Sequence, residues 1–155
     1  MRDLTDLADA DSLTDPVLRR RVRHVVTDNQ RVLEVVALLR APGGPSADTY
    51  REIGRLLTQA HVSLRDDFEV SWPEADAAVE AALAAGAAGA RMIGGGFGGS
   101  VLALVPAASG SPVRDAVTGA FARRGWTAPE FLDAVPADSA RQVSEEGMPR
   151  GSPAE

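Results

Sequence analysis

The sequence contains no cysteine and no lysine, and only two of its 155 residues, His24 and His61, are histidines. Without cysteine there is no disulfide framework and no thiolate zinc site. Without lysine there is neither a Walker A phosphate loop nor a Schiff base or lysine nucleophile. Two histidines are too few for a metal site built from imidazoles. All sixteen cationic side chains are arginines.

Long apolar runs and an excess of positive charge are also absent. No apolar run approaches the ~18 residues of a membrane span, and Met1-Arg2-Asp3 does not open a signal peptide. The net charge of −6 is opposite to that of a nucleic-acid-binding surface. Hydrophobic residues make up 45% and charged residues 25% of the chain, as in soluble globular domains. We expect a cytoplasmic protein that binds neither membranes nor nucleic acids.

Apolar residues at helical spacing predict three helices in the first half of the chain. Asp15-Pro16 provides an N-cap and a proline at the first helical position. The stretch "APGGP" ends this first helix, because its prolines and glycines cannot continue it. Ser71 and Glu74 stand at capping-box spacing before the third helix. The predicted ranges are 16–40, Ser46 to about Phe68, and Ser71 to about Ala85.

The second half changes from helical to strand-like patterning. Residues 90–93 and 100–105 are short apolar runs bounded by glycine or proline, which is typical of buried strands. A third strand is predicted over 130–135. Between the second and third predicted strands, Ser111-Pro112 predicts the N-terminal cap of another helix, and Gly125 predicts its end.

This order of elements predicts an α+β domain, with a small antiparallel sheet packed against about four helices. We expect the domain to cover residues 1–143. The polar residues 144–155 are predicted to form a disordered tail.

The segment between the first two predicted strands has five glycines in six positions. It consists of Gly94, Gly95, Gly96, Phe97, Gly98 and Gly99, and is followed by Ser100. Each ordered glycine costs roughly 0.5–1 kcal/mol relative to alanine, so glycines that are merely tolerated in a hairpin loop are the weaker interpretation. A G-x-G-x-x-G match is present, but a dinucleotide site needs a helix to begin inside the motif. The apolar run that follows stops at Pro106, too early for that helix.

We expect the backbone of residues 94–100 to approach a ligand, or a second loop that holds one, very closely. Successive glycine amides without side-chain cover can line a concavity of phosphate size. A side chain added at Gly96 is then expected to fill the space that this ligand or loop needs.

Four other features have structural interpretations. His61 lies on the apolar face of the second helix and is expected to be a partly buried histidine with satisfied hydrogen bonds, not a catalytic one. Asp66 and Asp67 are adjacent on a helix, so they point about 100° apart and cannot jointly hold a magnesium ion. Phe97 is expected to anchor the glycine loop through its ring, and Asn29 to be a buried amide. No catalytic residue and no metal ligand is assigned in this chain.

Three stretches resemble the galactokinases, which belong to the GHMP family of small-molecule kinases. "RMIGGGFGGS" (91–100) resembles their third signature motif, and "RRRVRHVVTDNQRV" (19–32) is similar to the segment around their Arg-His-Val-Val element. "HVSLRDDFEVSWPEAD" (61–76) resembles their Ser-His-x-Ser-Leu-Arg-Asp-Asp-Tyr-Glu-Val-Ser-Cys-Pro-Glu-Leu-Asp stretch. The matches occur in the family's order and extend from about Leu4 to Val143. The departures are Ile93, Phe68 and Trp72, where the family usually has threonine, tyrosine and cysteine.

The resemblance implies a GHMP kinase C-terminal domain and the ATP- and Mg²⁺-dependent phosphorylation of galactose to galactose 1-phosphate. The family's Arg-x-Asn-x-Ile-Gly-Glu-His sugar motif, its Gly-Leu-Ser-Ser-Ser phosphate loop and its proposed aspartate base precede these stretches, and none of them occurs here. The chain therefore resembles a C-terminal half, with the N-terminal half as its partner and the source of sugar binding.

Residues 94–100 would close on the phosphate site of that half. Alone, the chain is expected to be inactive, to bind ATP weakly at best, and to self-associate through its uncovered apolar face. The alternative is a non-catalytic galactokinase-like sensor or a stand-alone binding module.

Overall fold

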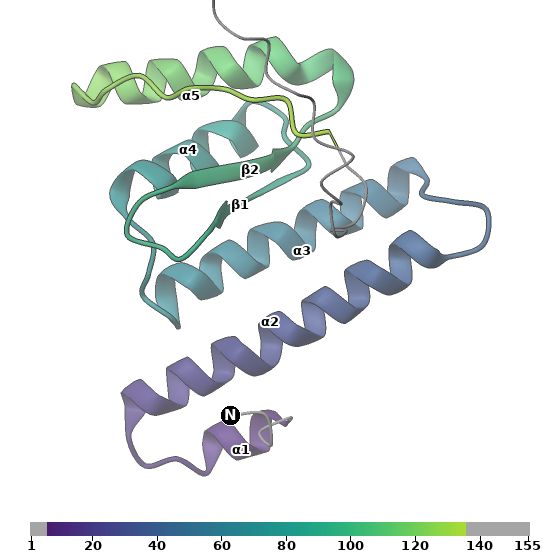
Figure 1. The fold of residues 1–155 in the computed structure, drawn as a ribbon, viewed down its shortest axis with the longest axis vertical. Coiled ribbons are helices and arrows are strands. Elements are labelled where there is room, and N and C mark those ends of the chain that lie inside the picture. Colours follow the sequence, from purple (N-terminus) through teal and green to yellow (C-terminus); the bar gives the residue numbers. More distant parts are fainter. Residues whose placement is uncertain (1–5, 136–155) are drawn as a thin grey trace, which may run out of the picture.

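A computed structural model describes residues 6–135 of the chain (Figure 1). The predicted tail and the end of the predicted domain lie outside these residues. The elements are α1 (Leu7–Asp11), α2 (Pro16–Arg40), α3 (Ala47–Asp66), α4 (Pro73–Ala84), β1 (Gly89–Ile93), β2 (Ser100–Leu104), a 3₁₀ turn (Ala107–Ser109) and α5 (Gly110–Arg124). The predicted α+β class is confirmed: the described residues form four long helices, one short helix and a two-stranded antiparallel sheet. None of the described helices is both long and apolar enough to span a membrane.

The elements stack in sequence across the molecule. Helix α3 runs along β1, α2 packs on the far side of α3, and α1 packs on α2 (Figure 1). Helix α4 contacts both strands and carries α5 on its other side. The largest core cluster lies between α4, α5 and the sheet, and consists of alanines and valines with Phe121.

The predicted start of α2, start of α3 and end of α5 are confirmed. Asp15 Oδ1 accepts hydrogen bonds from the first amides of α2, at 2.7 and 3.2 Å. Ser46 and Thr49 form a reciprocal capping box at the start of α3. Gly125 ends α5 in the left-handed conformation, with φ +68°. These signals act between neighbours in the chain, so sequence alone reveals them.

The predicted capping box before α4 is wrong. Trp72 occupies the N-cap position without a side-chain cap, because the Ser71 hydroxyl donates instead to Asp76 Oδ1 at 2.6 Å. Helix α5 likewise begins at Gly110, ahead of the predicted cap at Ser111.

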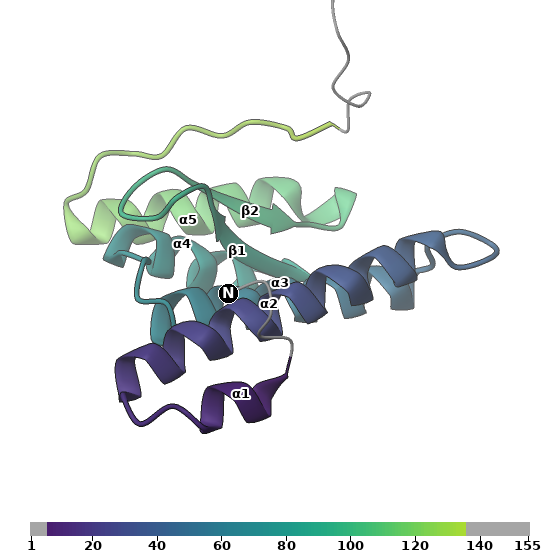
Figure 2. The ribbon, with the colours of Figure 1, turned by 60° about the horizontal axis from the view of Figure 1, so that its bottom comes forward.

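The predicted strand at 130–135 does not form. Within the described residues, no backbone hydrogen bond involves residues 127–135. The segment passes over α5 (Figure 2) and is held by Arg114, which donates to Asp133 at 2.6 Å and lies 5.3 Å from the Phe131 ring. A strand requires a neighbouring strand, and none lies beside this segment in the described part of the chain.

The second half of α2 is exposed. It extends beyond the sheet together with the start of α3 (Figures 1 and 2). Asn29 is exposed here, so its prediction as a buried amide is wrong. The apolar residues beyond it are exposed as well, among them Leu33 (61%) and Leu39 (50%). The apolar stripe of α2 therefore continues past the part that α3 covers.

Helix α3 and strand β1 touch through their backbones. A Cβ atom at Gly54 would lie 2.1 Å from the Ala88 carbonyl oxygen, and one at Gly89 would lie 1.9 Å from the Gly54 carbonyl oxygen. Neither position can carry a side chain without moving the helix away from the strand.

This close approach lets α3 satisfy the outer edge of β1. The Ala90 amide donates to Thr58 Oγ1 at 3.4 Å, and the Met92 amide donates to His61 Nδ1 at 3.3 Å. Gly54, Thr58 and His61 are four and three residues apart, so they share one face of the helix. In the described residues, β2 has no partner on its outer edge.

Candidate functional site

The glycine loop, residues 94–99, connects the two paired strands directly, because Ile93 pairs with Ser100. Four of its five glycines adopt positive φ angles, which side chains rarely tolerate. These are Gly94 (+93°), Gly96 (+89°), Gly98 (+142°) and Gly99 (+112°). The loop's own conformation therefore requires most of its glycines.

Phe97 lies within this loop with its side chain 79% exposed. Its ring does not anchor the loop within the described residues, so that prediction is wrong. Its backbone is the anchor instead, since the Phe97 amide donates to the Val70 carbonyl at 2.9 Å. Phe97 also has a positive φ of 56°, which is strained for a non-glycine residue.

Gly96 and Gly95 have opposite surroundings. A Cβ at Gly96 would lie 2.6 Å from Val70 Cβ and 2.7 Å from the Val70 carbonyl oxygen. The expected space for a partner at Gly96 is therefore occupied by this chain itself. Gly95 has no positive φ, and no atom of the described residues other than its chain neighbours lies within 4 Å of its Cβ position. The Cβ positions of Gly94 and Gly98 are equally free of described atoms. Among the amides of residues 94–99, that of Phe97 is the only one with an acceptor in the described residues.

The turn that holds the loop, residues 67–71, is clamped from α2. Arg20 and Arg21 bind the Glu69 carboxylate at 3.1 and 2.5 Å, and Arg21 also donates to the Asp67 carbonyl. Glu69 itself has a positive φ of 58°. Sequence reasoning missed this role of the arginines, because their acceptors lie on a distant segment.

His61 is 2% exposed and links β1 to α4. Its Nδ1 accepts the Met92 amide, so the neutral ring carries its proton on Nε2. Nε2 lies 3.2 Å from Asp76 Oδ1, although the N–H is not well aligned for a hydrogen bond. Burial lowers the pKa of His61, with Asp76 opposing and Arg65 assisting the shift. His61 is thus more deeply buried than predicted, and among the described residues its Nε2 lacks the predicted hydrogen bond. Its titratable partner comes from α4, which helix spacing could not reveal.

His24 forms a second buried network on the other side of the turn. Ser63 Oγ donates to Asp67 Oδ2 at 2.9 Å, so His24 Nδ1, 3.0 Å away, donates to Ser63. The ring stacks on Phe68 with centroids 4.6 Å apart. Burial lowers the pKa of His24, with the Asp28 carboxylate opposing the shift. The three segments singled out in the sequence, 19–32, 61–76 and 91–100, thus meet around one turn and one loop.

The adjacent carboxylates at the end of α3 have separate partners. Asp66 binds Arg65 at 2.7 Å, whereas Asp67 accepts from Ser63. Across residues 6–135, no group of three or more histidines, aspartates or glutamates is placed to hold a metal ion.

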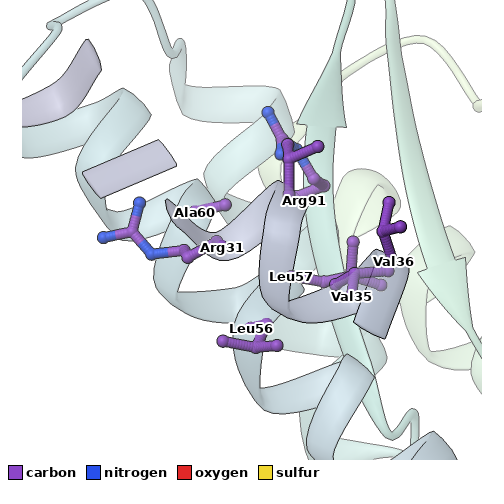
Figure 3. Close-up of a pocket in the computed structure, with 8 residues that line it drawn as sticks. Arg31, Val35, Val36, Leu56, Leu57, Ala60 and Arg91 are labelled. Carbon is purple, nitrogen blue, oxygen red and sulfur yellow. The ribbon is translucent and has the colours of Figure 1, made fainter. Parts of the chain in front are cut away.

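Two hollows on the surface of residues 6–135 bear on the site. The larger, of about 1260 Å³, is bounded by β2, by residues 129–134 and by side chains of α3, α4 and α5. The smaller, of about 180 Å³, lies between α2 and α3 (Figure 3). Its two cations, Arg31 and Arg91, lie 3.4 and 3.7 Å from Asp28 Oδ1. Asp28 therefore compensates one of these two positive charges, and the remaining lining is apolar, formed by valines, leucines and Ala60.

Comparisons with known proteins agree with this arrangement. The family model of the GHMP kinases C terminal matches residues 35–123. A galactokinase of Streptomyces coelicolor is 54% identical over 126 residues, covering 81% of this chain and 31% of that protein. A galactokinase of Mycobacterium tuberculosis is 45% identical over 124 residues, covering 79% of this chain and 32% of its own length.

A crystal structure of Lactococcus lactis galactokinase complexed with galactose superposes with a TM-score of 0.70 at 34% identity. The superposition covers 83% of this chain and 34% of that one. The chain therefore spans about a third of the length of the relatives it matches.

Proposed function

Because the chain belongs to the family of GHMP kinase C-terminal domains, we propose that it is the C-terminal lobe of a galactokinase-type sugar kinase. The reaction of the whole kinase is the ATP-dependent transfer of a phosphoryl group to galactose, giving galactose 1-phosphate. The glycine loop carries this proposal, since its backbone is open on one side and fixed on the other. We expect the complete enzyme to act in the cytoplasm.

The open side of the loop suits an anion. Apart from their chain neighbours, no atom of residues 6–135 lies within 4 Å of the Cβ positions of Gly94, Gly95 and Gly98. Their amides have no acceptors in the described residues, and neighbouring amides of this kind bind phosphate oxygens. The role proposed for residues 94–100 is to donate these hydrogen bonds to the phosphates of ATP, or to a phosphate-holding loop of the N-terminal half. Phosphoryl transfer depends mainly on such positioning and electrostatic stabilisation.

The magnesium ion that accompanies ATP does not fit the residues described. The described part of the chain has no group of three or more carboxylates or histidines placed to hold a metal ion, and Asp66 and Asp67 bind Arg65 and Ser63. We assign its ligands, together with the sugar site and the catalytic base, to the N-terminal half.

The larger hollow supports docking of that half. The unpartnered edge of β2 lies in its wall, and exposed apolar side chains stand around it, including Leu39 (50%), Tyr50 (45%) and Phe131 (37%). Apolar patches of this kind mark surfaces that another part of a protein covers. In the relatives, about two thirds of the length lies beyond the matched region and could supply that cover.

One observation favours the alternative, a non-catalytic galactokinase-like sensor. Ile93 precedes the loop and is 41% exposed, in the place where the resemblance leads us to expect a threonine hydroxyl. A sensor would bind sugar and nucleotide without turnover.

A chimera tests the proposal. This chain replaces the matching region of the Streptomyces coelicolor galactokinase, and galactose-dependent release of ADP is measured. We expect turnover by the chimera and its loss in a Gly95→Val chimera, because valine covers the open side of the loop without touching the rest of the lobe. Ligand binding without turnover would instead support the sensor.

The chain alone serves as the second arm. Two or three solvent-exposed hydrogen bonds, each contributing about 0.5–1.5 kcal/mol, barely reach the roughly −4 kcal/mol of a millimolar complex. Titration calorimetry with Mg-ATP should therefore detect weak binding at most. Micromolar binding by the isolated chain would contradict the assignment as a lobe that needs a partner.

A further inference from the structure

The glycine loop is held at two points, and both lead to the same carboxylate. Before the loop, the Met92 amide is bound by His61. At its tip, the Phe97 amide is bound by the carbonyl of Val70, whose chain neighbour is Ser71. Asp76 Oδ1 lies 2.6 Å from the Ser71 hydroxyl and 3.2 Å from His61 Nε2.

The hydrogen bonds of this network indicate which atoms carry the protons. His61 accepts the Met92 amide through Nδ1, so its proton is on Nε2. Nε2 lies 3.2 Å from Asp76 Oδ1 in an electrostatic contact that is not aligned as a hydrogen bond, and it has no hydrogen-bond partner among the described residues. The Ser71 hydroxyl donates to the same oxygen, and Ser71 lies one residue before the N-cap position of α4, which Trp72 occupies. The buried imidazole and the Ser71 hydroxyl thus both face one carboxylate oxygen, Asp76 Oδ1.

We propose that Asp76 and His61 are positioning residues of the glycine loop. Asp76 ties the strand that enters the loop, through His61, to the turn that holds its tip, through Ser71. The two anchor points then move together, and the open amides keep one arrangement. What the loop binds rests on the proposed function, whereas the tie is a property of the chain itself.

Amide hydrogen exchange measured by NMR on the full chain tests the tie without substrate. In Asp76→Ala we expect the Phe97 amide to exchange at least tenfold faster. The amides of α5 should change in exchange rate only as much as any change in the stability of the whole domain requires. Asp76→Asn should keep exchange slow, because the oxygen of its side-chain amide can still accept from Ser71 and face the His61 N–H. A role in packing alone would not produce this rescue.

Two controls separate the tie from general loosening. Glu74→Ala removes another carboxylate from the first turn of α4. Thr58→Val removes the hydroxyl of α3 that accepts from the Ala90 amide of β1. Neither variant should accelerate hydrogen exchange of the Phe97 amide. Should Asp76→Ala fail to fold, Ser71→Ala breaks the same link and is expected to give the same acceleration.

The inference is overturned if the Phe97 amide exchanges at the wild-type rate in Asp76→Ala and Ser71→Ala. It is also overturned if Glu74→Ala or Thr58→Val accelerates this exchange as much as Asp76→Ala does. An inactive chimera with the expected exchange pattern would remove the proposed function and leave the tie standing. An active chimera with unchanged exchange would do the reverse.

Discussion

Replacement of Gly96 by alanine should release the glycine loop from the lobe. The new Cβ would lie 2.6 Å from Val70 Cβ and 2.7 Å from the Val70 carbonyl oxygen. A backbone oxygen cannot swing aside as the end of a long side chain can. The φ of +89° adds a second penalty, because alanine disfavours this region.

Two routes are open to the variant, and the less costly one sets the measured loss. Keeping the loop in place costs about 1–2 kcal/mol for the left-handed backbone and about 1–3 kcal/mol for the overlap. Lifting the loop off Val70 instead surrenders the Phe97 hydrogen bond, a net loss of about 0.5–1.5 kcal/mol. We therefore expect the free energy of unfolding to fall by about 1 kcal/mol, which lowers the Tm by roughly 2–4 °C in a chain of this size.

Thermal unfolding followed by circular dichroism measures the shift, and the exchange rate of the Phe97 amide reports on the loop. Gly95→Ala is the matched control. The Cβ atom of its alanine would lie more than 4 Å from every described atom other than those of its chain neighbours, so we expect no loss of stability. A gain of up to about 1 kcal/mol is expected where alanine reduces the conformational entropy of the unfolded chain. Equal melting of the two variants, or a Phe97 amide still protected in Gly96→Ala, would refute this reasoning.

Three further outcomes are expected. Burial lowers the pKa of His24 and of His61, so the unfolded chain binds protons more readily, and stability should fall as the pH drops below 6.5. Guanidinium unfolding at several pH values measures this dependence. The free energy of unfolding should change by at most about 1.4 kcal/mol per pH unit for each histidine, and the double variant His24→Gln/His61→Gln should show a smaller dependence. Leu39→Arg, at the edge of the larger hollow, should weaken a concentration-dependent dimer in sedimentation; a wild-type chain that stays monomeric would argue against an uncovered face. Phe97→Ser should change the free energy of unfolding by less than about 0.5 kcal/mol, because the ring is 79% exposed, and a larger loss would mean that the ring is an anchor.

The parts of the fold that depend on neighbouring residues were predictable from the sequence. Asp15-Pro16, Ser46 and Gly125 act on backbone groups within one helical turn, and each has its predicted role. Ser71 shows the limit of such signals. The spacing of Ser71 and Glu74 fits a capping box, but the Ser71 hydroxyl donates to Asp76 instead.

The third strand failed for a different reason. Residue types can show that a short segment suits a sheet, but not whether a partner strand lies beside it. Residues 130–135 are extended across α5 without a backbone partner in the described part of the chain.

The glycine loop was recognisable from composition alone, but its inner and outer faces were not. Gly95 and Gly96 are indistinguishable in the sequence, and only the fold places Val70 against one of them. The contacts of His61 with Asp76, and of Arg21 with the turn at Glu69, likewise join segments that sequence patterns treat separately.

The side chains that α3 offers to β1 limit how this sheet can grow. Thr58 and His61 occupy the amides that a further strand would need, so β1 is closed to pairing. Two copies that met along β2 would make one continuous sheet whose outer strands are both β1. Such an assembly has no free edge left among the described strands, so it ends at a two-fold dimer instead of extending into a fibre.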